Sequence, residues 1–353
     1  MKTEHKVIFS PAQDMSILRD GSVNLVVTSP PYPMVEMWDD IMGKQNAAIL
    51  KAQIKQMPNK VFELMNQELD NVWKECFRVL TEGGFLCINI GDATRTINGN
   101  FKLYNNHSRI AQYCNSIGFN EMPCILWRKE TNAPNKFMGS GMLPNGAYVT
   151  LEHEYILIFR KGSKRDYRKE VDKNARKNSA FFWEERNTWF SDIWNIKGAK
   201  QTMSIKASRE RNGSFPIELP YRLINMYSQK GDIVLDPFMG IGTSMIAAML
   251  SNRNSVGFEI DRTLKDVISD RILAISIDKA NGLIKKRFER HLQFVEDREN
   301  NQKKEVKHYN SFLKCKVMTK QEEFLTFDYL KSIKIKDTSD FSFETEYLDE
   351  LCI

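Results

Sequence analysis

Short apolar stretches alternate along the chain with longer stretches in which apolar residues recur every three to four positions. The first pattern is typical of β-strands and the second of amphipathic helices, so their order predicts an α/β fold with a mostly parallel sheet and helices on both faces. Strands are predicted at 6–10, 23–29, 85–92, 121–129, 148–161, 232–238 and 254–260, and helices at 59–80, 105–117, 217–229, 243–251 and 263–295.

The composition is that of a globular protein. With 353 residues and a hydrophobic content of 42%, the chain can form one large α/β domain with an insertion, or two domains. No apolar run approaches the roughly 20 residues of a membrane span, and the first residues lack the apolar core of a signal peptide. The six cysteines are scattered without a CxxC pair. We therefore expect a cytoplasmic protein with reduced thiols and no zinc site.

Positive charge is concentrated in one segment that lacks a clear period. The formal charge of the whole chain is +6, whereas residues 160–211 alone hold fifteen Lys or Arg and seven Asp or Glu, a surplus of eight. Such a segment favours nucleic acid as a partner; a solvated, lysine-rich insertion is the alternative. The candidate DNA-binding side chains are Arg165, Arg168, Arg176, Arg186, Arg209 and Arg211.

A glycine-rich turn follows the predicted strand at 232–238, in the sequence GDIVLDPFMGIGTS. Asp236 ends the strand, and Gly240 and Gly242 let the backbone approach a ligand closely. The next two residues, Thr243 and Ser244, begin a predicted helix, where free N–H groups and a hydroxyl favour a carboxylate.

An acid at the end of the next predicted strand adds to this pattern. Glu259 lies 23 residues after Asp236, where a carboxylate can accept both hydroxyls of a ribose. The three-glycine dinucleotide fingerprint is absent, so a nucleoside that carries an amino acid suits the site better than a pyrophosphate, and S-adenosyl-L-methionine is such a molecule. A purely structural turn is the alternative for the glycines taken alone.

A rigid corner follows the strand at 23–29, because two adjacent prolines each fix a backbone angle and remove an N–H donor. The corner consists of Ser29, Pro30, Pro31 and Tyr32. Ligands of open α/β sheets bind beyond the carboxyl ends of the strands. We therefore expect the corner and the glycine-rich turn to face one site, although some 200 residues separate them.

These two motifs, TSPPY followed much later by DPFMGIGTS, resemble those of the amino-methyltransferases that modify exocyclic amines of DNA bases. The motif order is similar to that of their circularly permuted β group, and SPPYPMVEMWDD resembles the cytosine-N4 enzymes of type II restriction systems. The resemblance covers residues 6–275 and implies a Rossmann-like methyltransferase fold, S-adenosyl-L-methionine as cofactor, double-stranded DNA as substrate, and no metal. It divides the chain into a catalytic half (1–162), a target recognition region (163–211), a cofactor half (212–298) and an extension (299–353).

The resemblance also implies roles for single residues. The Ser29 side chain and the Pro30 carbonyl accept the hydrogens of the target amino group, Pro31 fixes that carbonyl, and Tyr32 stacks on a base extruded from the duplex. The residues that it places near the cofactor are Ser10, Asp14, Phe215, Asp236, Pro237, Phe238, Gly240, Gly242, Thr243, Ser244 and Glu259. Ser10-Pro11-Ala12 departs from the usual Gly-Asp-Ala, which leaves Asp14 as the nearest acid.

Three alternatives stay open. A serine at the first motif position is linked to cytosine in this family, and Asp or Asn to adenine, so an adenine-N6 enzyme is one alternative and an RNA amino-methyltransferase is another. The third is a DNA-binding protein that has kept the fold without the activity. The sequence leaves the choice between monomer and homodimer open.

Overall fold

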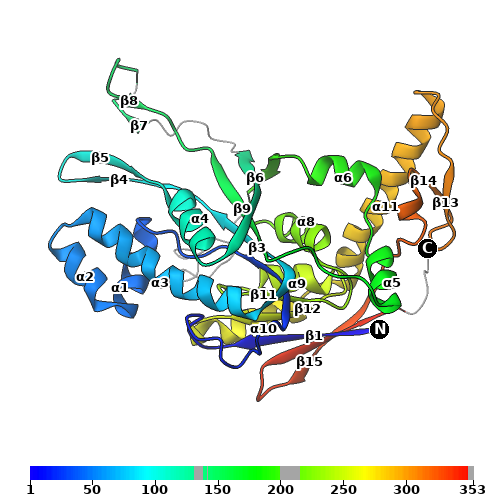
Figure 1. The fold of residues 1–353 in the computed structure, drawn as a ribbon, viewed down its shortest axis with the longest axis horizontal. Coiled ribbons are helices and arrows are strands. Elements are labelled where there is room, and N and C mark those ends of the chain that lie inside the picture. The colour runs from blue at the N-terminus through cyan, green and yellow to red at the C-terminus, as the bar shows by residue number, and fades with distance from the viewer. Residues whose placement is uncertain (131–137, 141, 199–214, 349–353) are drawn as a thin grey trace.

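The computed structural model describes residues 1–130, 138–140, 142–198 and 215–348, and a ten-stranded sheet runs through its centre (Figure 1). The strand order is β10 (Ile193–Lys197), β6 (Phe119–Glu130), β9 (His153–Lys161), β3 (Leu80–Ile90), β2 (Val23–Thr28), β11 (Ile233–Asp236), β12 (Asn254–Phe258), β1 (Lys2–Ile8), β16 (Ser342–Tyr347) and β15 (Leu330–Asp337). Among the described residues, the antiparallel pairs of this sheet are those of β9 with β3 and β6, of β16 with β1, and of β15 with β16; its other pairs are parallel. The predicted mostly parallel sheet is therefore confirmed.

Helices cover both faces of the sheet. α3 (Pro58–Val79) and α4 (Asn106–Ser116) pack on one face, and α8 (Glu218–Tyr227) and α9 (Thr243–Met249) pack on the other. In β2, Val26 belongs to the core under α3, whereas Leu25 and Val27 belong to the core under α8. Because successive strand residues point to opposite faces, a strand between two helical layers is apolar at nearly every position.

The remaining elements lie around this centre. Figure 1 shows one group on the left and another, with both ends of the chain, on the right. The left group contains α1 (Asp39–Gln45), α2 (Ala47–Ile54) and the hairpins β4 (Ala93–Ile97)–β5 (Asn100–Tyr104) and β7 (Met138–Gly139)–β8 (Ala147–Tyr148). The right group contains α5 (Glu170–Asn178), α11 (Ile277–Asn300), β13 (His308–Asn310) and β14 (Cys315–Val317). The other elements are α6 (Trp183–Trp189), α10 (Lys265–Leu273), η1 (Glu36–Trp38), η2 (Arg262–Leu264) and η3 (Lys320–Glu322).

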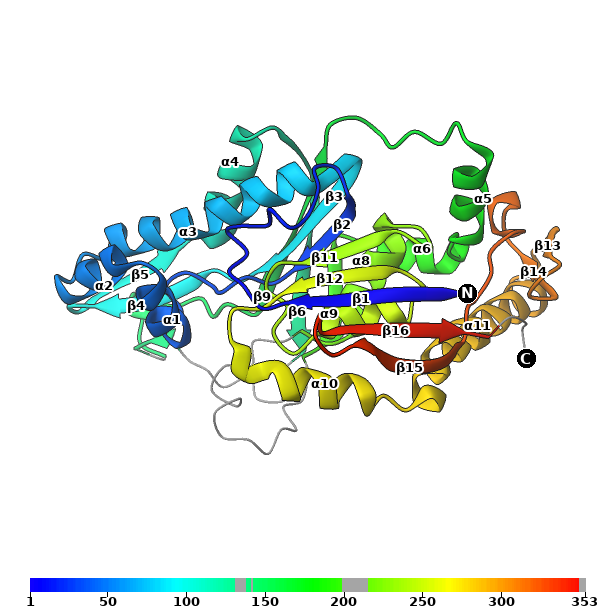
Figure 2. The same cartoon turned by 90° about the horizontal axis from the view of Figure 1, so that it is seen from below.

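Each predicted strand and helix has a counterpart in the structure, but one helix needs correction, and two further segments supply strands beyond those predicted. The helix predicted at 263–295 is two helices, because the chain leaves α10 at Leu273 and restarts at α11, whose first turn is capped by Ser276. The segment predicted as a C-terminal extension of unknown role, 299–353, supplies β15 and β16, and β16 pairs with β1 (Figure 2). The basic insertion also supplies a strand, since β10 pairs in parallel with β6.

The parallel strands give the sheet two different edges. We call the edge at which β2, β11, β12 and β1 end the carboxyl edge, and the opposite one the amino edge. Thr28, Asp236, Phe258 and Ile8 are the last residues of these four strands. Side chains that follow them are therefore brought together by the topology alone.

None of the helices in the described part of the chain combines the length and the apolar character that crossing a bilayer requires.

Candidate active site

The two sequence motifs meet at the carboxyl edge, because β2 and β11 are neighbouring parallel strands. The hydroxyl of Thr28, the last residue of β2, donates a hydrogen bond of 2.7 Å to the Oδ1 of Asp236, the last residue of β11. Residues 208 positions apart are thus in direct contact. The expectation that the corner and the glycine-rich turn lie together is confirmed.

Asp236 is a buried carboxylate that organises this contact. Only 5% of the residue is exposed. Its Oδ1 also accepts the backbone N–H of Phe238 at 3.1 Å. Burial raises the pKa of Asp236, because a charge inside the protein loses its hydration, while polar contacts with Ser244, Thr28 and the Phe238 N–H act in the opposite direction. The carboxylate therefore holds the glycine-rich turn against the end of β2.

The turn itself needs glycine at two positions. Gly240 has a φ of +53° and Gly242 a φ of +82°, a region that residues with a Cβ rarely adopt. A Cβ at position 240 would meet nothing within 4 Å, so the backbone here is open to an approaching molecule. Gly242 caps the start of α9, whose first residues are Thr243 and Ser244.

Glu259 follows β12 at the same edge and reaches back to the turn. Its Oε2 accepts the N–H of Gly240 at 2.9 Å, and its Oε1 accepts the N–H of Asp261 at 2.8 Å. The side chain is half-buried, and burial raises the pKa of its carboxyl group. Each carboxylate oxygen keeps a lone pair beyond these bonds, so Glu259 can accept further hydroxyl groups.

The hydroxyls at the start of α9 already have partners within the protein. Arg271 donates to the Thr243 hydroxyl at 3.0 Å, and the Ser244 hydroxyl donates to the Val27 carbonyl at 3.4 Å. The ring of Phe238 packs edge-on against Trp73. The predicted cofactor roles of Thr243, Ser244, Pro237 and Phe238 stay predictions.

The rigid corner after β2 is tied to the neighbouring strands by polar side chains. The Tyr32 hydroxyl donates to the Oε2 of Glu154 at 2.9 Å and lies 3.2 Å from the Ser29 hydroxyl. Asn89 donates to Tyr32 at 2.9 Å and to Glu154 at 2.7 Å, and the ammonium of Lys129 forms an ion pair with the other oxygen of Glu154. We call Ser29, Tyr32, Asn89, Glu154 and Lys129 the corner network.

The sequence did not single out three members of this network. Asn89 lies on β3, Glu154 on β9 and Lys129 on β6, three adjacent strands of the sheet. The signal available was that each polar residue falls near one end of an otherwise apolar strand. Because the sequence pattern indicates only the ends of each strand and not the order of the strands, it could not show that the three side chains converge.

Gly91 and Asp92 follow β3 beside the corner. A Cβ at position 91 would lie 3.0 Å from the Tyr32 ring, so glycine lets the ring pack closely against the backbone. The Asp92 carboxylate accepts the backbone N–H of His107 at 3.1 Å and contacts its ring nitrogen at 2.8 Å. Asp92 therefore stabilises the start of α4.

Comparison with known proteins identifies the family. The sequence profile described as DNA methylase, of the N6/N4 type, matches residues 23–270. This chain belongs to that family. It is 46% identical over 345 residues to the type II methyltransferase M.MthZI of Methanothermobacter thermautotrophicus, covering 97% of this chain and 95% of the relative. It is 51% identical over 282 residues to the type II methyltransferase M.MjaI of Methanocaldococcus jannaschii, covering 76% of this chain and 91% of the relative.

Solved structures agree with the fold of this DNA methylase. The protein TTHA0409 of Thermus thermophilus, crystallised with S-adenosyl-L-methionine, is 30% identical with a TM-score of 0.59, covering 76% of this chain and 92% of its own. The PvuII DNA methyltransferase, described as cytosine-N4-specific, has the same fold, with a TM-score of 0.53 at 15% identity, covering 81% of this chain and 93% of its own.

S-adenosyl-L-methionine is the cofactor of this methylase. The carboxyl edge fits the molecule. The backbone at Gly240 is open, and Glu259 offers acceptors to a ribose beside it. No group of His, Cys, Asp or Glu side chains within the described ranges could hold a metal ion.

Two further predicted cofactor residues of the methylase lie near this edge. Ser10 follows β1, the strand beside β12, and the Ile8 carbonyl there accepts N–H groups from both Ser10 and Glu259. Phe215 is buried in the core under α8, close to the start of that helix. Both positions are compatible with the predicted roles.

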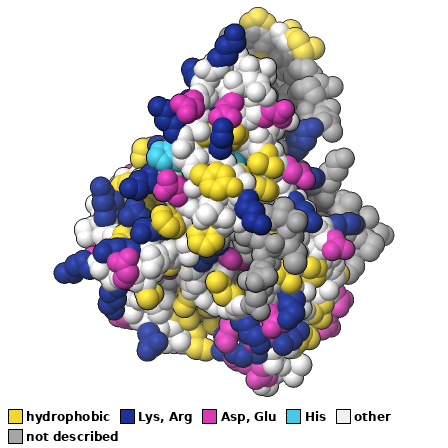
Figure 3. All heavy atoms as spheres, turned by 90° about the vertical axis from the view of Figure 1, so that its right-hand side faces the viewer, with side chains coloured by type: hydrophobic (Ala, Val, Ile, Leu, Met, Phe, Trp, Pro, Cys, Tyr) yellow, Lys and Arg dark blue, Asp and Glu magenta, His cyan; other side chains and the backbone are white. Residues whose placement is uncertain are grey.

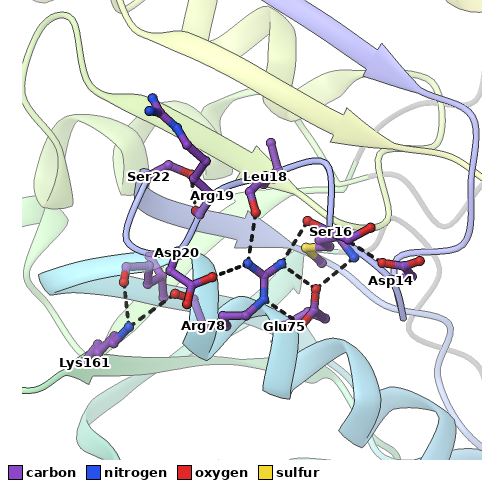
Figure 4. A network of polar contacts seen from close by, with 11 residues as sticks. Asp14, Ser16, Leu18, Arg19, Asp20, Ser22, Glu75, Arg78 and Lys161 are labelled. Carbon is purple, nitrogen blue, oxygen red and sulfur yellow. Dashed lines mark hydrogen bonds and ion pairs between the residues drawn. The ribbon is translucent and has the colours of Figure 1, made fainter.

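Asp14 has a different environment. It is exposed, and its carboxylate accepts the Ser16 N–H at 2.9 Å in the segment between β1 and β2 (Figure 4). Arg78 of α3 holds this segment by donating to the carbonyls of Met15 and Leu18, both at 2.9 Å. The structure therefore assigns Asp14 a local bond within a segment held to α3, and its cofactor role stays a prediction.

The predicted DNA-binding arginines of the methylase are not brought together at the active site. Arg165 forms a double hydrogen bond with Asp232, at 2.7 and 2.9 Å, just before β11 begins, which is at the amino edge. Arg168 pairs with Asp166, and Arg176 lies over the ring of Tyr167. Figure 3 shows the molecule from the side that carries α5 and α11, where basic side chains lie among acidic and apolar ones.

Of the other three candidate arginines, the structure describes Arg186. It lies on α6, over the ring of Phe190 at 4.8 Å. Arg209 and Arg211 lie outside the described residues. They follow β10, and β10 ends at the carboxyl edge because it runs parallel to β6 and β2. Within the described part of the predicted recognition region, the chain therefore reaches the carboxyl edge at the end of β10.

Proposed function

We propose that this methylase transfers a methyl group to the N4 amino group of cytosine in double-stranded DNA and protects that DNA from a partner restriction enzyme. We choose cytosine because a serine, Ser29, stands at the first position of the corner, beside the glycine-rich turn. Support for the restriction context comes from the two archaeal relatives, both described as type II methyltransferases and both matched over at least 91% of their length.

The corner supplies what this reaction needs. The lone pair of an exocyclic amine is delocalised into its ring, so the amine becomes nucleophilic only when its hydrogens are drawn out of the ring plane. We assign this role to two acceptors, the Ser29 hydroxyl and the Pro30 carbonyl. Pro31 keeps that carbonyl fixed, and the bound cofactor supplies an electrophilic methyl group. Positioning is then the main catalytic term.

Tyr32 offers its ring to the target base. A base within a duplex has to be extruded to reach the corner, and stacking on an aromatic ring stabilises it by roughly 1–3 kcal/mol. In the structure the ring is held at its hydroxyl by Glu154 and Asn89, and its edge lies against Gly91. The stacking surface is therefore rigid before DNA binds.

The base can be identified by methyl transfer from labelled S-adenosyl-L-methionine to DNA, followed by nucleoside analysis. We expect N4-methylcytosine. If N6-methyladenine is found instead, the target base is adenine. If the label enters only RNA, the substrate is RNA and not DNA. Absence of incorporation into any nucleic acid would leave a DNA-binding protein that shares the fold.

The role of Ser29 has its own test. Ser29→Ala should slow the methyl transfer step by roughly 10²-fold, because it removes one of two acceptors aimed at the reacting group. Its Kd for the cofactor should change less than about twofold. Ser22→Ala is the matched control, since that hydroxyl donates to the Arg19 carbonyl in the segment before β2. Equal losses in rate and cofactor affinity would place Ser29 in the cofactor site.

A further inference from the structure

A chain of hydrogen bonds leads from the predicted catalytic serine into the sheet. The Ser29 hydroxyl lies 3.2 Å from the Tyr32 hydroxyl, which donates at 2.9 Å to the Oε2 of Glu154. Glu154 is on β9, two strands away from β2, and only 12% of its side chain is exposed. Neither the stacking role of Tyr32 nor the acceptor role of Ser29 explains why the chain ends on a carboxylate.

The donors and acceptors in this chain have one consistent direction. The Asn89 amide must present its N–H groups here, because an amide oxygen would face the Glu154 carboxylate at 2.7 Å. Tyr32 has a single hydroxyl hydrogen, and Glu154 accepts it. The contact between Ser29 and Tyr32 therefore uses the hydrogen of Ser29. The Asn89 amide also lies 3.5 Å from the Ser29 oxygen, a long contact that uses at most one lone pair. The other lone pair of the Ser29 oxygen stays available as an acceptor.

The groups that contact Glu154 are one cation and two hydrogen-bond donors. Lys129 from β6 forms an ion pair with its Oε1, while Asn89 from β3 and Tyr32 from the corner donate to its Oε2. Lys129 and Tyr32 are the titratable groups that these contacts place against Glu154. Burial and the charge of Glu154 raise the pKa of Tyr32 well above its usual value, so the tyrosine keeps its proton.

We propose that Glu154 is the terminal acceptor of the proton that the target amino group loses, and that Ser29 and Tyr32 deliver this proton. The proposal rests on the role of Ser29 proposed above. The amino nitrogen forms a bond to the methyl carbon as the bond from that carbon to sulfur breaks, so the positive charge passes from sulfur to nitrogen. The nitrogen gives a proton to the Ser29 oxygen, Ser29 passes its own to Tyr32, and Tyr32 passes its own to Glu154.

The step ends with a neutral methylated base and a protonated Glu154. Both hydroxyl groups return to their original protonation state, so Tyr32 acts without ionising, in agreement with its raised pKa. Glu154 touches no substrate atom in this scheme and acts through Tyr32 as a positioning residue and proton acceptor. Its second oxygen faces Lys129, whose side chain is 42% exposed, and this side of the carboxyl group gives the proton a way to solvent.

The test compares single-turnover methyl transfer rates across pH, with cofactor and DNA saturating at every pH so that binding does not contribute. In the wild type the rate should fall towards acidic pH, because a proton acceptor has to be unprotonated to act. Glu154→Gln should lower the rate at neutral pH by roughly 10²-fold and remove this acidic decline, because a general base contributes about that factor. Tyr32→Phe should lower the rate similarly, since it keeps the ring and interrupts the chain.

Two controls separate charge from structure. Glu152→Gln removes an exposed carboxylate that pairs with Arg128, two residues from Glu154, and should leave the rate unchanged. In Glu154→Gln the new amide would face the Lys129 ammonium, so the double variant Glu154→Gln with Lys129→Met removes that clash between donors. The rate of the double variant should stay low, because the proton acceptor is still missing.

The outcomes distinguish this proposal from the proposed function. Recovery of the rate in the double variant, or an unchanged acidic decline in Glu154→Gln, would overturn the proton route and leave a structural clamp on Tyr32. If Ser29→Ala abolishes transfer while Glu154→Gln and Tyr32→Phe keep the wild-type rate, only the proton route fails. If Ser29→Ala transfers normally, the proposed role of Ser29 fails as well. Thermal unfolding of each variant checks that the fold is intact.

Discussion

The contact between Thr28 and Asp236 can be tested with one almost isosteric change. Thr28→Val keeps the shape of the side chain and removes the hydroxyl that donates to the Asp236 carboxylate at 2.7 Å. Thr28 and Asp236 are 1% and 5% exposed, so water cannot replace the lost donor without entering the core. A hydrogen bond to a charged group contributes about 1.5–3 kcal/mol. We expect the free energy of unfolding to fall by that amount at neutral pH.

The loss should depend on pH, because it concerns the ionised form of Asp236. Burial already raises the pKa of this carboxyl group above its usual value of 3.8. The folded protein thus binds this proton more tightly than the unfolded chain does. The contribution of Asp236 to stability falls as pH rises from about 4 through the raised pKa. Without the Thr28 hydroxyl the pKa rises further, so the difference between variant and wild type should grow from acidic to neutral pH.

The assay is urea unfolding of both proteins from pH 4 to pH 8, followed by fluorescence. Thr28→Ser is the control, because it keeps the hydroxyl and removes only one methyl group, at a cost of about 0.8 kcal/mol that should not vary with pH. If Thr28→Val is as stable as Thr28→Ser at pH 7, the contact contributes little. A loss that is constant across pH would show that packing, and not the carboxylate, accounts for it.

Three further predictions concern single sites. Gly91→Ala should destabilise the protein by about 1–3 kcal/mol and slow methyl transfer, since its Cβ would lie 3.0 Å from the ring beside it; a wild-type melting temperature and rate would contradict this packing. Glu259→Gln should weaken S-adenosyl-L-methionine binding roughly tenfold at neutral pH in calorimetry. Wild-type affinity should fall as pH drops through the pKa that burial raises, while that of the variant should not; parallel pH curves would remove Glu259 from the ribose site. Arg165→Ala should lower the melting temperature, because Asp232 loses its ion-pair partner, and should leave the salt dependence of DNA binding unchanged. Arg209→Ala should instead reduce the salt slope of DNA binding by about one. The reverse pattern would place DNA at the amino edge.

The central strands and the two motifs could be predicted from sequence because their signals are local. β2 and β11 are short apolar runs that end in residues whose chemistry is specific, Ser29-Pro30-Pro31-Tyr32 after one and Asp236 followed by the glycine-rich turn after the other. The positive φ of Gly240 and Gly242 follows from the same few residues. Where a pattern lies within one element, the sequence is sufficient to place it.

The corner network and the position of the basic insertion could not be predicted, because they depend on the order of the strands, which no local pattern in the sequence indicates. Asn89, Glu154 and Lys129 converge only because β3, β9 and β6 are neighbours, and both strand pairings involved are antiparallel. The basic insertion is predicted to bind DNA, and its members lie in different places: Arg165 is paired with Asp232 at the amino edge, while β10 ends at the carboxyl edge. Charge density along a chain does not determine on which edge of a sheet the charges lie.

At the end of β2, two consecutive residues connect the glycine-rich turn to the corner, so the fold itself can align the cofactor with the target base. Thr28 is hydrogen-bonded to Asp236, which holds the glycine-rich turn, and the next residue, Ser29, belongs to the corner network. Consecutive Cα atoms are fixed about 3.8 Å apart, and both proline rings that follow restrict the backbone further. A displacement of the glycine-rich turn therefore moves Thr28 and, through one peptide bond, Ser29, the proposed acceptor for the target amine. Because in-line transfer depends on the relative position of nitrogen, carbon and sulfur, we infer that binding the cofactor and orienting the base are coupled at these two residues.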